Sequence, residues 1–201
     1  YYLDDNGQYV YNEAGSLNYK HQNDILAGYV EYDGKWGKWG LKGGVRYEHT
    51  WQNVKYIVGR GEDFKMDYGN LVPSANLSYA LADNQNIGLT YNMRISRPGI
   101  TYLNPYVDQT DPTSITYGNT DLECEEAHNI SLVYNLFTPK WIVNLTLREG
   151  ICDNAIESYS FYQDNVLHTT YGNIVKNHQT GLNAFVNWNA GPKTRIYMNG
   201  G

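Results

Sequence analysis

The chain has 201 residues, including 20 Gly, 20 Tyr and five Trp, and charged residues make up 18% of it. The aromatic content and low charge exclude a disordered chain, and the many Gly and Asn residues, which are poor helix formers, exclude a helical bundle. The net charge of −6 argues against nucleic-acid binding through backbone attraction. No apolar run approaches the roughly 20 residues of a transmembrane helix, but spanning strands remain possible.

Apolar and polar residues alternate without exception over 87–96. A period of two places one set of side chains on each face of a β-strand. The same alternation recurs along the chain and predicts an all-β, antiparallel protein of about eight strands. The predicted strands are 22–33, 36–50, 68–82, 86–97, 123–136, 140–150, 176–189 and 193–199, preceded by a strand remnant and loop at 1–21.

Short and long connections alternate between these strands. Short turn signals are centred near residues 34, 84, 139 and 191. Long polar connections cover 51–67, 97–121 and 158–175. This arrangement is typical of a transmembrane β-barrel with short periplasmic turns and long extracellular loops, and it has no counterpart in a soluble sandwich. The sequence therefore predicts a segment of a transmembrane β-barrel.

The tryptophans follow the same division. Trp36, Trp39, Trp141 and Trp188 lie within a few residues of a short turn, and Trp51 ends a predicted strand at a long loop. Indole rings favour the boundary between apolar chains and headgroups, so this placement predicts aromatic girdles at both membrane interfaces. The alternative is a β-sandwich with scattered core tryptophans.

A run of short motifs stands at 94–125. The motifs are Arg94-Ile95-Ser96-Arg97-Pro98, Leu103-Asn104-Pro105, Asp111-Pro112, Tyr117-Gly118-Asn119, Asp121-Leu122 and Glu125. This run resembles the outer-membrane β-barrel region of TonB-dependent receptors from the Bacteroidota, and 70–79 and the turn at 34–39 look like the same family. Thr120 and Cys124 replace two prolines usual in the family's pattern, and Glu123 replaces its lysine.

The resemblance implies a barrel of about 22 strands filled by a plug domain. Residues 1–201 are then expected to form part of one outer-membrane β-barrel domain, without the plug. The family's function is to bind a nutrient, such as a siderophore, cofactor, glycan or peptide, and import it with energy from the TonB complex. The implied partners are outer-membrane lipid, the plug and remaining strands, the TonB complex and the nutrient. The alternative is a small self-closed barrel that acts as an anchor, adhesin or passive pore.

Loop 97–121 carries the candidate binding residues, which combine aromatic faces with hydrogen-bonding groups. They are Arg97, Tyr102, Asn104, Tyr106, Asp108 and Asp111. The alternative is that the turn-forming residues of this loop only fold it back into the barrel mouth. Arg94 and Arg148 share the lumen-facing phase of their strands, where they can meet water or the plug. Contact with the plug is the favoured interpretation.

The remaining polar residues point to no catalysis. The five histidines are isolated, and no metal-binding pair, nucleophile motif or phosphate loop is present, so we expect neither an enzyme nor a cofactor or metal site. Cys124 and Cys152 form a possible disulfide. If Leu136 pairs with Trp141, the two cysteines lie one residue out of register, and a bulge near Glu125 would bring them opposite each other.

Overall fold

The computed structural model describes residues 2–3, 6–10, 18–59 and 61–201. Most of these residues are in strands, which confirms the all-β fold and the eight long strands. The strands are β1 (Tyr2–Leu3), β2 (Tyr9–Val10), β3 (Asn18–Trp36), β4 (Trp39–Val58), β5 (Phe64–Ala82), β6 (Gln85–Ser96), β7 (Asp108–Asp111), β8 (Ser114–Thr116), β9 (Glu125–Phe137), β10 (Trp141–Gln163), β11 (Val166–Gly191) and β12 (Thr194–Gly200), and the helix is α1 (Ile100–Leu103).

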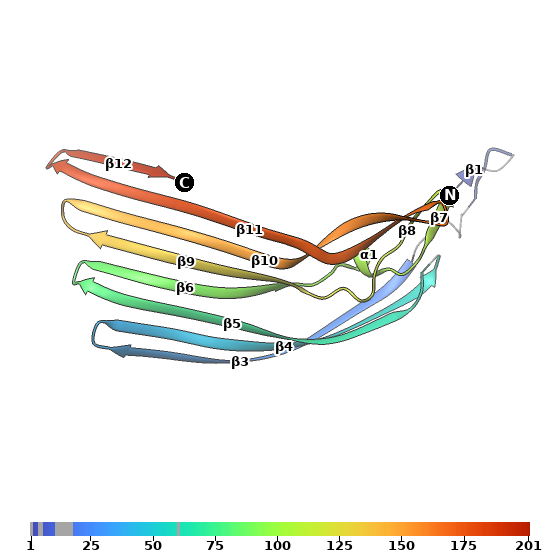
Figure 1. Cartoon of the computed structure of the whole chain (residues 1–201), viewed down its shortest axis with the longest axis horizontal. Coiled ribbons are helices and arrows are strands. Elements are labelled where there is room, and N and C mark those ends of the chain that lie inside the picture. The colour runs from blue at the N-terminus through green and yellow to red at the C-terminus, as the bar shows by residue number, and fades with distance from the viewer. Residues whose placement is uncertain (1, 4–5, 11–17, 60) are drawn as a thin grey trace.

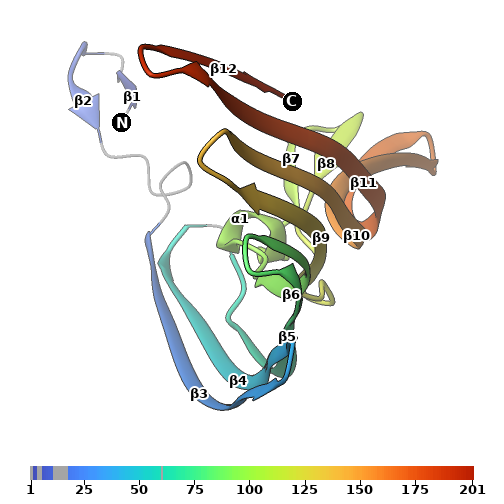
Figure 2. The same cartoon turned by 90° about the vertical axis from the view of Figure 1, so that its left-hand side faces the viewer.

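The eight long strands form one curved antiparallel wall in the order β3-β4-β5-β6-β9-β10-β11-β12 (Figures 1 and 2). Each strand pairs with its sequence neighbour among the long strands, as in an up-and-down barrel. Strands β3 and β12 stand at the two edges, so the wall is open. The short β8 pairs in parallel with the outer half of β11, and β7 pairs with β8. Strands β1 and β2 form a separate two-stranded sheet.

The two faces of the wall differ in polarity, and the register shows this row by row. From β4 to β11, one cross-strand row on the convex face has a leucine on each of six neighbouring strands. These are Leu41, Leu77, Leu89, Leu132, Leu147 and Leu182. The adjacent row on the other face is polar. It contains Lys42, Asn76, Thr90, Ser131 and Arg148. Leu132 remains 42% exposed within the chain, so the leucine row provides the apolar band that faces lipid.

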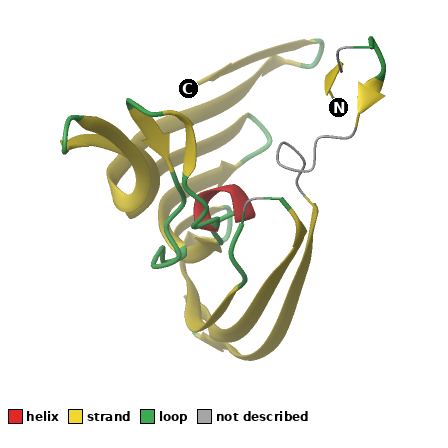
Figure 3. Cartoon of the chain, turned by 90° about the vertical axis from the view of Figure 1, so that its right-hand side faces the viewer, coloured by secondary structure: helices red, strands yellow, loops and turns green. Residues whose placement is uncertain are grey.

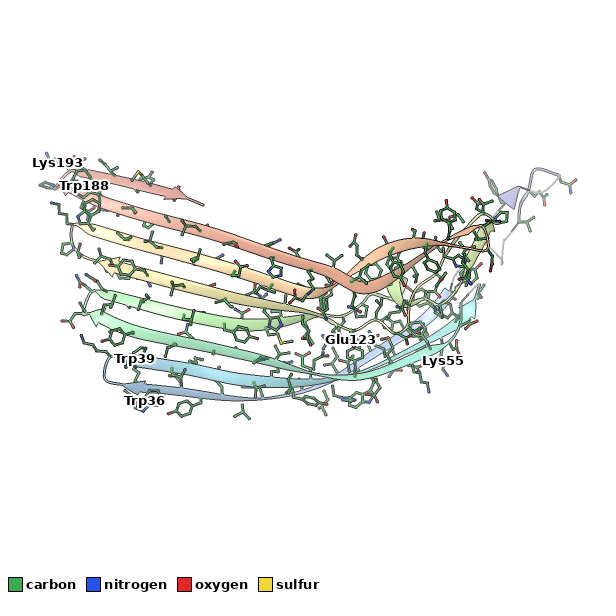
Figure 4. All side chains as sticks on the ribbon, viewed as in Figure 1. Trp36, Trp39, Lys55, Glu123, Trp188 and Lys193 are labelled. Atoms are coloured by element: carbon green, nitrogen blue, oxygen red, sulfur yellow. The ribbon has the colours of Figure 1, made fainter. Side chains whose placement is uncertain are left out.

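Aromatic rings gather at the short-turn end of the wall, as the girdle hypothesis predicts (Figure 4). Trp141 and Trp188 are cross-strand partners, and their rings stack with centroids 5.5 Å apart. Trp36 pairs with Trp39 across the first turn, and Trp39 packs on Tyr79 at 4.5 Å. Such rings mark the periplasmic interface of the membrane.

Two of the three predicted long loops are wrong. Residues 51–67 are mostly strand, because β4 runs to Val58 and β5 starts at Phe64, and Trp51 lies within β4 instead of ending it. Residues 158–175 form a hairpin that turns at Asp164 and Asn165, with φ of 51° and 64°. Two consecutive left-handed residues fit a two-residue hairpin turn. Beyond the membrane neither face must be apolar, and these strand segments mix apolar residues such as Val54 and Ile57 with polar ones on both faces, so they lacked the expected alternation.

The N-terminal prediction is only partly correct. Residues 18–21, expected as loop, are the start of β3, and β1 and β2 form the short hairpin described above. Residues 11–17, which belong to the same predicted segment, lie outside the described residues. The third long connection, 97–121, contains α1, β7 and β8 and folds into the concave side of the wall, where Figure 3 shows the helix and its flanking loops.

Candidate functional site

The segment 97–124 packs into the mouth of the curved wall. Its apolar anchors are Leu103 and Leu122, whose side chains are 1% and 3% exposed, and Pro98 is also buried. These residues belong to the motifs that carried the family resemblance. Part of the motif run therefore serves the folding of the loop, and direct ligand contact by the other residues of the run stays a prediction.

Arg97 fastens the start of this segment to β4. Its Nε donates to the Thr50 hydroxyl at 3.2 Å, and its Nη2 forms an ion pair with Glu48. Glu48 also accepts a hydrogen bond from Arg46 Nε at 2.7 Å. Because the segment lies inside the curve, these contacts show that even-numbered β4 residues face the lumen. The row register extends this orientation to Arg148, as predicted.

Asparagines fasten the end of the segment to β10 and β11. Asn154 accepts from the Glu126 N–H at 2.8 Å and donates to the Cys124 carbonyl at 2.9 Å. Asn173 accepts from the Glu123 N–H at 2.9 Å and donates to the carbonyls of Glu123 and Asn154. Sequence reasoning missed both residues, since Asn in an Asn-rich chain carries no distinguishing signal.

A close backbone approach joins the two halves of the segment. Gly118 N–H donates to the Asn104 carbonyl at 2.7 Å, and Asn119 N–H donates to the Tyr102 carbonyl at 2.7 Å. A Cβ at Gly118 would lie 2.5 Å from the Asn104 carbonyl oxygen, so only glycine fits there. Asn104 also accepts from the Tyr106 N–H at 3.1 Å. Asn104, predicted to bind ligand, therefore organises the loop.

The other predicted binding residues have different environments. Tyr102 is 41% exposed, and its ring packs against Tyr171 with centroids 4.9 Å apart. Asp111 accepts from the Thr113 N–H at 2.9 Å and from its hydroxyl at 2.7 Å, which lowers the pKa of Asp111. The Asp108 side chain lies outside the described residues. Tyr102 thus offers the most accessible aromatic face of the six.

The predicted lumen arginines lie on the inner face. Arg148 pairs with Ser131 of β9, and Arg94 pairs with Ala127, which precedes Ser131 by four residues. Because four is an even number, both arginines lie on the same face. Both side chains are exposed, and among the described residues neither forms an ion pair. Several lumen charges on β3 and β4 are instead paired, as in Lys42 with Glu31 at 3.0 Å and Arg46 with Glu48 at 2.7 Å.

An aromatic cluster at the outer hairpin was missed by the sequence analysis. Phe161 stacks on His168 at 5.1 Å and on Tyr159 at 6.1 Å, and Tyr117 meets His168 edge-on at 6.1 Å. The Asp-Asn turn between Gln163 and Val166 was the signal that could have revealed it, because this hairpin places Phe161 opposite His168.

The two cysteines are free thiols in the structure. The expected pairing of Leu136 with Trp141 is wrong, because Leu136 pairs with Val143 and Cys152 consequently lies opposite Ala127. Cys124 precedes β9, and its burial raises the pKa of its thiol. Burial beside Cys124 also raises the pKa of Tyr68 to about 12. Within the described ranges, no group of three or more His, Cys, Asp or Glu side chains is placed to hold a metal ion.

Comparisons with known proteins agree with this architecture. A sequence profile of the outer membrane protein beta-barrel family matches residues 1–201, and the chain belongs to this family. Its location is therefore the cell outer membrane. No curated protein sequence matches the chain. Among the helices that the structure describes, none has the length and apolar character needed to cross a membrane.

Solved structures with the same fold are barrels of TonB-dependent receptors. The Serratia marcescens hemophore receptor HasR has a TM-score of 0.61 at 17% identity, covering 85% of this chain and 32% of HasR. The Pseudomonas aeruginosa siderophore receptor PirA has a TM-score of 0.58 at 16% identity, covering 91% of this chain and 42% of PirA. The FrpB iron transporter from Neisseria meningitidis has a TM-score of 0.62 at 15% identity, covering 88% and 25%. The chain thus corresponds to less than half of each receptor.

Proposed function

We propose that the chain is the barrel portion of a TonB-dependent receptor that binds a nutrient outside the cell and imports it. The observation that carries this proposal is the open wall with the motif segment 97–124 packed into its mouth. Edges β3 and β12 leave backbone groups that further barrel strands can pair. A self-closed anchor, adhesin or passive pore is less well supported, because closure needs these two edges to meet.

In this proposal the inner face receives the plug. Arg94 and Arg148 are exposed cations on the polar inner face and form no ion pair with the described residues, and they suit carboxylates or carbonyls of the plug. The outer segment contributes to nutrient capture through Tyr102 and Tyr171, whose tilted rings offer a stacking face. The TonB complex acts on the full receptor, and the nutrient is a siderophore, cofactor, glycan or peptide.

The test is uptake in cells that depend on the full receptor. Radiolabelled candidates of the four nutrient classes are supplied to cells with and without an active TonB complex. Energy-dependent uptake of one class supports import, and uptake that persists without energy coupling supports the passive pore. Tyr102→Ala should weaken capture of that nutrient, while Tyr162→Ala, at a 77% exposed tyrosine on the hairpin tip, is the matched control.

A further inference from the structure

The ladder between β5 and β6 stops where Pro73 removes a backbone donor. Its last pair toward the outer side is Ser74 with Asn92. Beyond that pair β5 continues to pair with β4 as far as Phe64, while β6 ends at Ser96. Figure 1 shows β5 and β6 side by side near the short turns and diverging toward the outer end. The outer part of β5 therefore has a partner on only one side among the described strands.

The direction of the free backbone groups follows from the register. Ala80 N–H donates to the Lys38 carbonyl at 2.9 Å, so even-numbered residues of β5 point their backbone groups at β4. The β4–β5 ladder contains no register shift up to Phe64. Odd-numbered residues therefore point away from β4, in agreement with Pro73, which has no N–H to offer. Residues 65, 67, 69 and 71 present a row of donors and acceptors to the space beside β5.

That space is a cleft of about 460 Å³ between residues 65–70 of β5 and a second lip formed by residues 120–124 and Glu126. The second lip is fixed, because Asn173 and Asn154 hold the N–H groups of Glu123 and Glu126. The cleft thus has a strand edge on one side and an anchored backbone on the other. Glu123 lies in the outer half of the molecule, as Figure 4 shows.

The charges around the cleft are predominantly negative. Four carboxylates line it, from Asp67, Asp121, Glu123 and Glu126, against the single cation of Lys65. Asp67 pairs with His49 at 2.6 Å. Within the described part of the chain the other three carboxylates have no cation within ion-pair distance. An extended chain that carries basic side chains matches both the hydrogen-bonding edge and this charge.

We propose that this cleft receives an extended, lysine- or arginine-bearing segment of a partner protein, which adds to residues 65–71 of β5 as an extra strand. The cleft lies between the outer edge of β5 and the anchored backbone that leads into β9, so its occupant becomes part of the wall and is not the imported nutrient. This role goes beyond nutrient import and requires no particular nutrient. Residues 65–71 match about seven residues of an extended partner, a length of roughly 23 Å.

The test uses the full receptor in detergent and fluorescence anisotropy of a labelled octapeptide of alternating Lys and Thr. We expect saturable binding that weakens with salt. Two control peptides have Glu in place of Lys, or N-methyl groups on alternate backbone nitrogens, and neither should bind. Equal binding of either control peptide, or no binding of the Lys peptide, would overturn the proposal.

Two variants at Lys65 separate backbone pairing from charge. Lys65→Pro removes one N–H from the free edge, whereas Lys65→Ala removes only the side chain, and both remove the positive charge. We expect Lys65→Ala to bind the peptide at least as tightly as the wild type, and Lys65→Pro to bind roughly two- to tenfold more weakly than Lys65→Ala. Equal affinities of the two variants contradict strand addition.

The acidic lip is tested by the double substitution Asp121→Asn and Glu123→Gln, which should lower affinity and reduce the salt dependence. Asp83→Asn, at an exposed short turn at the opposite end, is the matched control. Peptide uptake into cells, measured with the same labelled octapeptide, tests the nature of the occupant. Accumulation inside the cell would overturn a resident partner segment in favour of cargo, whereas binding without uptake supports it.

Discussion

The half of the molecule near the short turns and the outer half are built on the same strands but held together differently. In the first half, backbone ladders and an alternation of apolar and polar rows suffice, and the leucine row faces lipid. In the outer half, hydrogen bonds of individual side chains hold the irregular segment 97–124. Arg97 donates to the Thr50 side chain, and Asn154 and Asn173 donate to backbone carbonyls. The wall is therefore specified by the alternation of apolar and polar residues that lipid requires, whereas the mouth is specified by individual side-chain contacts.

The two halves also differ in what they indicate about function. The wall identifies a membrane barrel, whose fold supports many functions. The mouth carries the individual side-chain features, namely the Tyr102–Tyr171 pair, an aromatic hairpin and an acid-lined cleft.

The largest effect is expected from a charge on the lipid face. Leu132→Arg places a cation in the leucine row, about midway across the membrane, and should destabilise the inserted barrel by about 2–4 kcal/mol. Val133→Arg, one residue away on the inner face, is the control and should cost far less. Folding of the full receptor into lipid vesicles under urea measures both. Equal destabilisation would contradict the assignment of the two faces.

The ion pair that fastens the mouth should have the next largest effect. Arg97→Ala leaves the partly buried Glu48 with one cation fewer and should loosen segment 97–124, at a cost of about 1.5–3 kcal/mol for a charged hydrogen-bonded contact. The measurement is the rate of limited proteolysis within the segment in the intact receptor.

A double substitution sharpens this second prediction. Glu48→Gln alone should also speed cleavage, and adding it to Arg97→Ala should have little further effect if the two side chains act through one contact. Additive effects on the cleavage rate would show that Arg97 and Glu48 act independently.

The wall could be predicted from the sequence in most respects, because lipid imposes the alternation that made 87–96 readable. The mouth could not. Its strands at 51–58 and 158–163 mix apolar and polar residues on both faces, so the sequence predicted loops there. The two-residue turn at 164–165 is a local signal that the predicted long connection concealed. The expected pairing of Leu136 with Trp141 was wrong because the turn between β9 and β10 is tighter than expected. Thr138 N–H donates to the Trp141 carbonyl at 2.7 Å, and Leu136 therefore pairs with Val143.

The candidate site was predictable as a segment but not as a set of roles. The motifs located 97–124, yet Arg97, Asn104 and Asp111 turned out to bind the protein's own backbone or side chains. The direction of each polar side chain in the segment depends on how Leu103 and Leu122 are buried. The segment has no repeating apolar pattern from which this packing could be predicted. Ligand contact by Tyr102, whose side chain is 41% exposed, stays a prediction.

A smaller effect is expected at the close backbone approach in the mouth. Gly118→Ala brings a methyl group against the Asn104 backbone and should cost about 1–3 kcal/mol through local overpacking. Gly99→Ala is the matched control, because a Cβ at Gly99 meets no atom within 4 Å. Proteolysis of the segment should be faster only in Gly118→Ala. Faster cleavage in both variants would attribute the effect to glycine content and not to the contact.

The smallest effect concerns the turn at Asp111, which lies fully exposed at the tip of the segment. Hydrogen bonds from Thr113 lower the pKa of Asp111 below its ordinary value of 3.8, so the ionised carboxylate favours the folded turn. This contribution is present above pH 3.8 and is lost as the pH falls through the lowered pKa. Asp111→Asn keeps an acceptor for the turn but does not titrate. Cleavage of the tip by pepsin should therefore accelerate below about pH 4 in the wild type relative to Asp111→Asn, and parallel pH profiles would show that this carboxylate does not hold the turn.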